Sequence, residues 1–149
     1  MEIRRALPKD ASAIAKAERQ IFSDPWGERS ITDAISTEGS MCYVAERDGR
    51  LAAYVLGRII APEGEIYRIA TLPEYRERGI AYRLLSYAYK TELGHGLETL
   101  FLEVRSKNTA ALALYRAFGF IAMGTRKKYY KDPEDDAVIM IKASSADMP

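Results

Sequence analysis

Two predicted strand-to-helix junctions carry residues that could do chemistry. At the first, Arg76-Glu77-Arg78-Gly79 follows a predicted strand and opens the clearest predicted helix. A helix start offers free N–H groups and a positive dipole end, Gly79 lets a ligand approach the backbone, and two arginines add charge. The segment predicts a pyrophosphate-binding loop, although it lacks both the Walker and the dinucleotide glycine patterns. A charged loop without a ligand is the alternative on this segment alone.

The second junction leads from a strand at 99–104 into a helix at 109–118. Glu103 lies on the strand face opposite Leu102 and Val104, where an ordinary solvated carboxylate is also expected. Tyr115 falls on the apolar stripe of the helix, so its spacing alone predicts core packing. Asn108 precedes the helix and suits its N-cap.

Hydrophobic periodicity and turn signals predict the elements that position these residues. The resulting order is β-α-α-β-β-β-α-β-α-β-β, which predicts an α/β (α+β) fold with a mixed sheet and helices on both faces. Tight turns are expected at Asp48-Gly49 and Glu63-Gly64. Strands are expected at 3–5, 41–46, 51–60, 65–72, 99–104, 120–130 and 137–142, and helices from Pro8 towards Ile21 and at 30–36, 79–93 and 109–118.

Composition limits the classes of protein. The 149 residues suit one domain, 1–149, in which 143–149 is expected to be a frayed tail. A net charge of +1 gives no strong field towards nucleic acid or membrane. With Cys42 as the one cysteine and a single histidine, neither an internal disulfide nor a Cys/His zinc site is expected, and no metal is predicted. The absence of an apolar signal core or spanning run predicts a cytoplasmic protein.

Both junctions resemble the signatures of the GNAT superfamily of N-acetyltransferases. The run 69–81 resembles its central coenzyme A-binding motif, and 108–120 resembles the motif in which Asn opens a helix that carries Tyr and ends in Gly-Phe. The resemblance implies a mostly antiparallel sheet of about seven strands and acetyl-CoA as cosubstrate. It implies these cofactor-binding residues: Ile69, Ala70, Thr71, Arg76, Glu77, Arg78, Gly79, Ile80, Ala81 and Asn108.

Three further segments resemble the RimI branch, which acetylates the N-terminal alanine of a small-subunit ribosomal protein. They are 22–26, 102–105 and 126–130. Ala81 departs from the Gly that RimI proteins often carry and matches other N-terminal acetyltransferases. The implied partners are acetyl-CoA and a protein N-terminus, that of a ribosomal protein or of another protein with a small first residue, without direct contact to nucleic acid or membrane.

The same resemblance implies direct attack within a ternary complex. Glu103 is the expected proton acceptor, directly or through water, and Tyr115 the expected acid for the leaving thiolate. An N-terminal amine has a pKa of about 8, against about 10.4 for lysine, so a modest base suffices. The expected walls of the peptide site are Phe22, Trp26, Tyr129 and Tyr130.

Two other functions remain open from the sequence. One is a GNAT enzyme that acts on a small-molecule amine or a lysine side chain, against which Trp26 and the pair Tyr129-Tyr130 argue. The other is a non-catalytic acetyl-CoA-binding domain, against which the presence of both Glu103 and Tyr115 argues.

Overall fold

The computed structural model describes residues 1–144. Two short 3-10 turns, η1 (Pro8–Asp10) and η2 (Pro73–Tyr75), accompany the helices and strands. The observed order matches the predicted one, so the α/β fold class is confirmed. In chain order the elements are β1 (Glu2–Arg5), α1 (Ala11–Ile21), α2 (Glu28–Ser36), β2 (Tyr43–Arg47), β3 (Arg50–Ile60), β4 (Glu63–Thr71), α3 (Ile80–Leu93), β5 (Thr99–Arg105), α4 (Thr109–Phe118), β6 (Ile121–Tyr130) and β7 (Asp135–Ala143).

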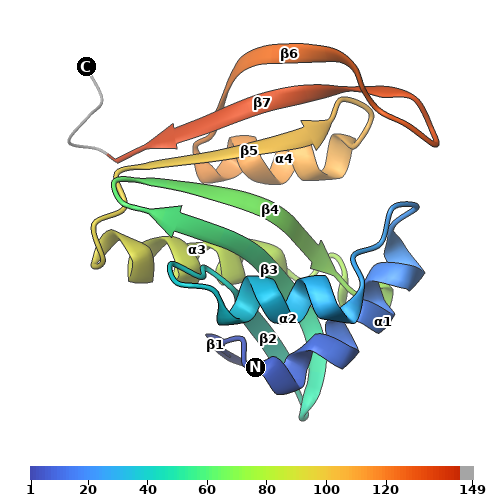
Figure 1. Cartoon of the computed structure of the whole chain (residues 1–149). Coiled ribbons are helices and arrows are strands. Elements are labelled where there is room, and N and C mark those ends of the chain that lie inside the picture. The colour runs from blue at the N-terminus through green and yellow to red at the C-terminus, as the bar shows by residue number, and fades with distance from the viewer. Residues whose placement is uncertain (145–149) are drawn as a thin grey trace.

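The seven strands form one sheet in the order β1-β2-β3-β4-β5-β7-β6 (Figure 1). Every neighbouring pair is antiparallel except β4 and β5, which run parallel. The exception follows from the connection, because η2 and α3 carry the chain back across the sheet before β5 begins. The mostly antiparallel sheet that the resemblance implied is therefore present.

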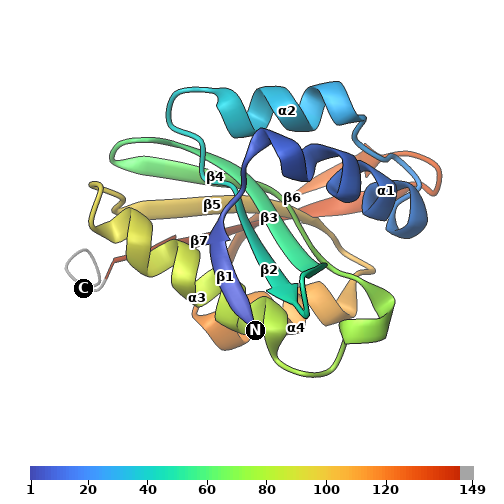
Figure 2. The ribbon, with the colours of Figure 1, turned by 90° about the horizontal axis from the view of Figure 1, so that it is seen from below.

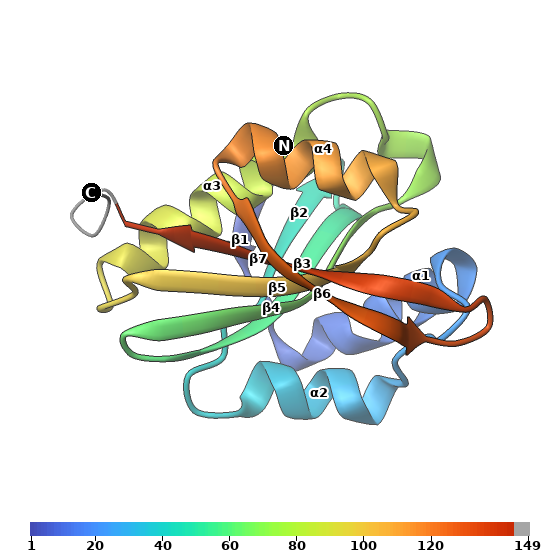
Figure 3. The ribbon, with the colours of Figure 1, turned by 90° about the horizontal axis from the view of Figure 1, so that it is seen from above.

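Helices cover both faces of this sheet. In Figures 2 and 3, α1 and α2 lie along one side and α3 and α4 along the other. Each pair closes its own apolar cluster: Ile14 and Ile31 pack on Tyr54, whereas Leu84 and Leu85 pack on Leu100 and its neighbours. Alternating strand residues supply the two layers, as β5 illustrates by burying every second side chain.

One predicted turn is wrong. Glu63-Gly64 does not form the turn after β3; the turn falls at 61–62, and both residues lie within β4, opposite Ile60 and Ile59. A Cβ on Gly64 would come within 2.9 Å of a Leu97 methyl carbon. A side chain at this position would therefore require Leu97 to shift. A glycine inside a strand is easily mistaken for a turn signal in the sequence.

The first two residues of the predicted frayed tail are bonded to the sheet. Ala143 is the last residue of β7, opposite Thr99, and the Ser144 N–H donates to the Glu98 carbonyl at 2.7 Å. The rest of the predicted tail, 145–149, lies outside the described residues.

Among residues 1–144, no helix is both long and apolar enough to cross a membrane.

Candidate active site

The two parallel strands separate in the middle of the sheet. Residues 63–66 of β4 pair with 99–102 of β5, and beyond Ile66 the strands diverge (Figure 1). Tyr67 is a bulge, since Leu56 pairs with Arg68 and Gly57 with Ile66. A bulge adds one unpaired residue and bends its strand. The divergence leaves the sheet open at its centre, and two adjoining cavities lie there.

The larger cavity, about 950 Å³, lies between β4 and the starts of α3 and α4. Nine of the ten predicted cofactor-binding residues line it; Arg78 does not. The Arg78 guanidinium instead lies 5.9 Å from the Tyr75 ring centroid. The fold thus gathers, around one cavity, predicted cofactor-binding residues that are up to 39 positions apart in sequence, from Ile69 to Asn108.

The start of α3 has the geometry of an anion site. Gly79 is the N-cap in the left-handed region, with φ +72°, and a Cβ placed there would meet nothing within 4 Å. Glu77 is also left-handed, with φ +63°. The first N–H groups of α3 lack intrahelical partners and belong to residues that border the cavity, so the residues present fit a pyrophosphate group.

The open edge of β4 offers unpaired main-chain groups to this cavity. The Leu72 N–H donates to Ala52 of β3 at 2.9 Å, so by strand alternation Ile69 and Thr71 direct their N–H and C=O groups away from β3. The Thr71 carbonyl already accepts from Arg76 Nε at 3.1 Å. An extended amide-containing arm could pair with this edge as a strand would.

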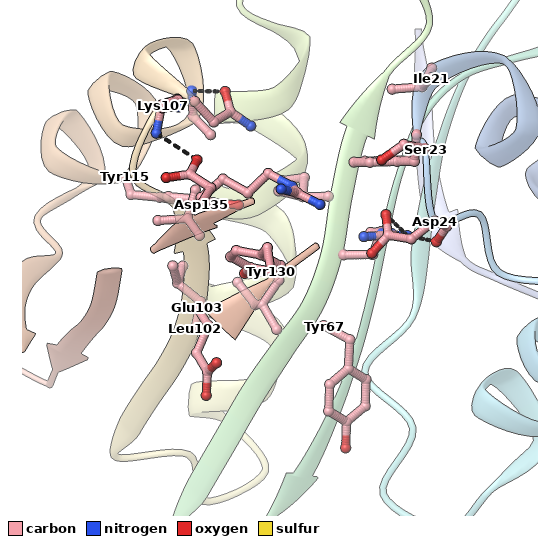
Figure 4. Close-up of a pocket in the computed structure, with 18 of the residues that line it drawn as sticks. Ile21, Ser23, Asp24, Tyr67, Leu102, Glu103, Lys107, Tyr115, Tyr130 and Asp135 are labelled. Atoms are coloured by element: carbon pink, nitrogen blue, oxygen red, sulfur yellow. Dashed lines mark hydrogen bonds and ion pairs between the residues drawn. The ribbon is translucent and has the colours of Figure 1, made fainter. Parts of the chain in front are cut away.

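The second cavity, about 470 Å³, contains the candidate catalytic residues Glu103 and Tyr115 (Figure 4). Phe22 and Tyr130, two of the four predicted peptide-wall residues, also line it. Five residues are common to the linings of both cavities, which therefore adjoin: Ile21, Phe22, Ile69, Asn108 and Ala111.

Glu103 lies on β5 at the point where β4 has moved away. Its Oε1 is 3.7 Å from an Arg126 nitrogen, and its Oε2 is buried without a hydrogen-bond partner in the described part of the chain. The side chain is 24% exposed. A carboxylate oxygen that is buried and unsatisfied at a cavity wall is suited to accept a proton or a hydrogen bond from a ligand.

Tyr115 is buried on α4, with its ring 5.5 Å from that of Phe120. Burial, and secondarily Tyr130, raises the pKa of Tyr115 above that of free tyrosine. Burial and the charge of Glu103 raise the pKa of Tyr130 to about 12. Both phenols therefore keep their protons at neutral pH and can act as hydrogen-bond donors or acids.

The loop before α4 is fixed by two polar side chains. Asn108 caps the helix, with its Oδ1 accepting from the Ala111 N–H at 3.1 Å, which confirms the predicted cap. Asp135 accepts from Ser106 Oγ at 2.5 Å and from the Lys107 N–H at 3.1 Å. These contacts hold the start of α4, and with it Tyr115, relative to β7.

Two predicted peptide-wall residues lie outside both cavities. Trp26 packs against the apolar cluster under α1 and α2, with its ring 5.9 Å from Tyr67. Tyr129 is 49% exposed and meets Tyr130 edge to face. The pairing of β6 with β7 shifts between Arg126 and Tyr130, so regular strand alternation does not hold there.

Sequence reasoning missed Arg68 and Glu18. Arg68 lines the second cavity, and its Nε donates to the fully buried Glu18 at 3.0 Å. A signal was present: Glu18 follows Ile14 by four residues and so falls on the apolar stripe of α1. A carboxylate at a core position requires a buried partner.

No group of three or more His, Cys, Asp or Glu residues within 1–144 is arranged to hold a metal ion.

Comparisons with known proteins agree with this geometry. The model of the "Acetyltransferase (GNAT) family" matches residues 11–120. Escherichia coli (strain K12) ribosomal protein bS18-alanine N-acetyltransferase is 31% identical over 135 residues, covering 88% of this chain and 89% of the relative. Mycobacterium tuberculosis N-alpha-acetyltransferase RimI is 36% identical over 141 residues, covering 91% and 87%.

The crystal structure of the Escherichia coli ribosomal-protein-S18-alanine N-acetyltransferase has a TM-score of 0.89 and 27% identity, covering 99% of this chain and 98% of that one. The chain belongs to the GNAT family of acetyltransferases. It is an acetyl-CoA-dependent N-acetyltransferase, and its resemblance to RimI proteins is confirmed.

Proposed function

We propose that this enzyme transfers the acetyl group of acetyl-CoA to the N-terminal amine of a protein. The acceptor is the N-terminal alanine of a small-subunit ribosomal protein, or a small first residue more broadly. One observation carries the proposal: two cavities adjoin where β4 and β5 separate, one at the anion-binding start of α3 and the other containing Glu103 and Tyr115. The names of the two relatives support the N-terminal acceptor.

The cofactor occupies the larger cavity in this proposal. Its pyrophosphate lies against the backbone at 76–81, and its pantetheine arm pairs with the open edge of β4 at Ile69 and Thr71. A main-chain N–H of this edge then faces the thioester oxygen and stabilises the negative charge that develops there. When bound, acetyl-CoA supplies the activated acyl group.

The acceptor peptide occupies the second cavity with its amine towards the first. Glu103 accepts a proton from the protonated amine, directly or through water, and the neutral amine then attacks the thioester carbon. The adduct loses its second N–H proton to water. The tetrahedral adduct collapses with cleavage of the C–S bond, and Tyr115 donates its proton to the departing thiolate. Because the pKa of Tyr115 is raised, this transfer is more uphill than for a free phenol.

Two peptides that share the same internal sequence test whether the acceptor is an N-terminal amine or a lysine side chain. One carries a free N-terminal alanine and blocked lysines, and the other an acetylated N-terminus and one free lysine. We expect mass spectrometry to find acetylation of the first peptide at a far higher rate, because lysine is more protonated at neutral pH and is presented differently. Preferential modification of the lysine peptide would overturn the proposal and favour a lysine or small-amine acceptor.

A series that varies the first residue tests selectivity. An apolar wall discriminates by only about ten- to two-hundred-fold per methylene, so Ala, Ser and Gly peptides should overlap in kcat/KM. A bulky first residue should react more slowly.

A further inference from the structure

A buried carboxylate on α1 ties together three distant parts of the chain. Glu18 has no exposed surface. Its oxygens accept from the Trp26 N–H at 3.0 Å, from the Tyr54 hydroxyl at 2.5 Å and from Arg68 Nε at 3.0 Å. The same carboxylate of α1 thus bonds the segment that follows α1, strand β3 and strand β4.

Arg68 extends this network to the segment between α1 and α2. Its Nη2 donates to the Asp24 carbonyl at 2.6 Å and lies 3.3 Å from Asp24 Oδ1. The guanidinium also stacks over Phe22, 3.9 Å from the ring centroid. One planar group thus contacts Glu18, Asp24 and Phe22 at once, while its side chain is only 13% exposed.

These side chains replace main-chain bonding in that segment. Within residues 1–144, backbone bonds frame it at Phe22, which donates to Glu18, and at Gly27, which accepts from Ile31. None joins Ser23, Asp24 or Trp26 to another main-chain group. The carbonyl of Asp24 and the N–H of Trp26 are held instead by Arg68 and Glu18.

The segment held in this way is a wall of the second cavity, which we name the acceptor cavity because the acceptor is proposed to bind there. Phe22, Ser23 and Asp24 line that cavity, and Figure 4 places Ser23 and Asp24 across β4 from Glu103 and Tyr130. Phe22 also lines the cofactor cavity. The position of this wall sets the width of the space that an acceptor would enter.

We infer that Glu18 and Arg68 are positioning residues that hold the 22–26 segment in the shape required to bind the acceptor. The inference rests on the proposed function and adds to it, since it assigns control of acceptor affinity to a pair outside the reacting groups. A buried ion pair adds little net stability but demands one geometry. Arginine suits the role because its rigid fork binds several partners at fixed angles, which a lysine cannot do.

Trp26 provides a direct measurement of this wall, because it is the single tryptophan of the chain. Arg68→Met removes the charge and the fork but keeps much of the volume, and Glu18→Gln weakens the same contacts from the other side. In both variants we expect the acrylamide quenching constant of Trp26 to rise by about two-fold or more, since a released segment samples open conformations.

The matched control is Arg4→Met. Arg4 forms a comparable pair of contacts, to Asp10 and Glu46, at β1 and η1, away from both cavities. It is expected to lower the melting temperature without changing the quenching of Trp26. Quenching that is unchanged in the Arg68 and Glu18 variants would overturn the inference without any assay of activity.

Steady-state kinetics give the second readout. We expect Arg68→Met to raise KM for the N-terminal peptide by about ten-fold or more and to change KM for acetyl-CoA much less, because the acceptor wall has moved. Arg68→Lys should recover part of the loss, since it keeps the charge beside Glu18, and it serves as the test if the methionine variant fails to fold. A lower melting temperature with an unchanged peptide KM would contradict the positioning role.

These outcomes are separable from failure of the proposed function. If the wild-type enzyme does not acetylate the N-terminal peptide, the function is wrong, and the fluorescence still decides whether the pair holds the wall. If the wild-type enzyme acetylates the peptide and both readouts are unchanged in the variants, only the positioning role is wrong.

Discussion

Glu103 combines a buried, unsatisfied oxygen with access to the acceptor cavity. Glu103→Gln keeps the shape but removes the basic oxygen. We expect kcat/KM at pH 7 to fall by roughly 10²- to 10⁴-fold, the range for loss of a general base. The defect should shrink towards pH 9, because an N-terminal amine with a pKa of about 8 is then already neutral.

The neighbouring carboxylate of Glu65 offers the control for that change. Burial and then the charge of Glu103 raise the pKa of Glu65, so the two groups share one electrostatic environment. Glu65→Gln should leave kcat/KM nearly unchanged, since Glu65 does not line the acceptor cavity. A Glu103→Gln defect that stays constant from pH 6 to 9 would argue against a role as base.

Tyr115 offers a second test at the level of one atom. Tyr115→Phe removes only the hydroxyl, so the ring contact with Phe120 and the melting temperature should be retained. We expect kcat to fall by roughly ten- to ten-thousand-fold with little change in acetyl-CoA affinity. Because burial raises the pKa of Tyr115, the wild-type enzyme should not lose activity through this group below about pH 10. Wild-type turnover in the phenylalanine variant would show that Tyr115 only packs.

Residue types in the sequence predict only some of the residues that surround the two cavities. Glu103, Tyr115 and the loop before α3 border the two cavities, as the motifs that mark their positions predict. Trp26 lies outside both cavities, which the sequence could not show because an aromatic residue serves a core as well as a binding wall. Arg68 was missed because its role depends on Glu18, fifty residues away, and on the fold that brings the two together.

At the level of elements, the start of α3 is the feature most open to test. Gly79→Asp places a carboxylate where the pyrophosphate is proposed to lie, whereas Gly79→Asn adds a side chain of similar size without the charge. Both residues tolerate a left-handed backbone better than most, so the strain at φ +72° is similar. We expect calorimetry to find a much larger loss of acetyl-CoA affinity for Asp than for Asn. Equal affinities in the two variants would place the phosphates elsewhere.

The element order was predictable because periodicity and turn residues act locally. The separation of β4 from β5 was not, since it depends on a bulge at Tyr67 and on pairing between strands that the sequence does not specify. The misplaced turn at Glu63-Gly64 has the same origin, because Gly64 packs closely against Leu97, a contact distant in sequence. Local signals therefore predict which helices and strands form. The distance between neighbouring strands of the sheet depends on the tertiary structure.

At the level of the whole molecule, the link between β7 and α4 predicts how stability responds to acid. Hydrogen bonds from Ser106 first, and then from main-chain N–H groups, hold the pKa of Asp135 below its usual range. A carboxyl whose pKa is lower in the folded state stabilises the fold above its unfolded pKa of about 4, and the contribution is lost as pH falls through the folded value. Asp135→Asn should therefore lower the urea midpoint at pH 7 and reduce its further fall towards pH 3.

The exposed Asp132, in the turn that precedes β7, supplies the comparison. Asp132→Asn should leave both the midpoint and its dependence on pH unchanged. If the urea midpoint falls equally from pH 7 to pH 3 in the wild-type protein and in Asp135→Asn, other carboxyl groups cause the loss of stability in acid.

In the proposed complex, the gap between β4 and β5 would link the stability of the protein to its substrate. Four parallel residue pairs join the two strands, and within residues 1–144 no further pair joins them. A pantetheine arm bound along β4 would bridge the two halves of the sheet while it is bound. By mass action, a ligand at a hundred times its Kd adds about 2.7 kcal/mol to the free energy of unfolding. A cell short of acetyl donor would then hold an enzyme that is idle and also unfolds more readily, so the supply of acetyl-CoA would govern how long each copy survives as well as how fast it works.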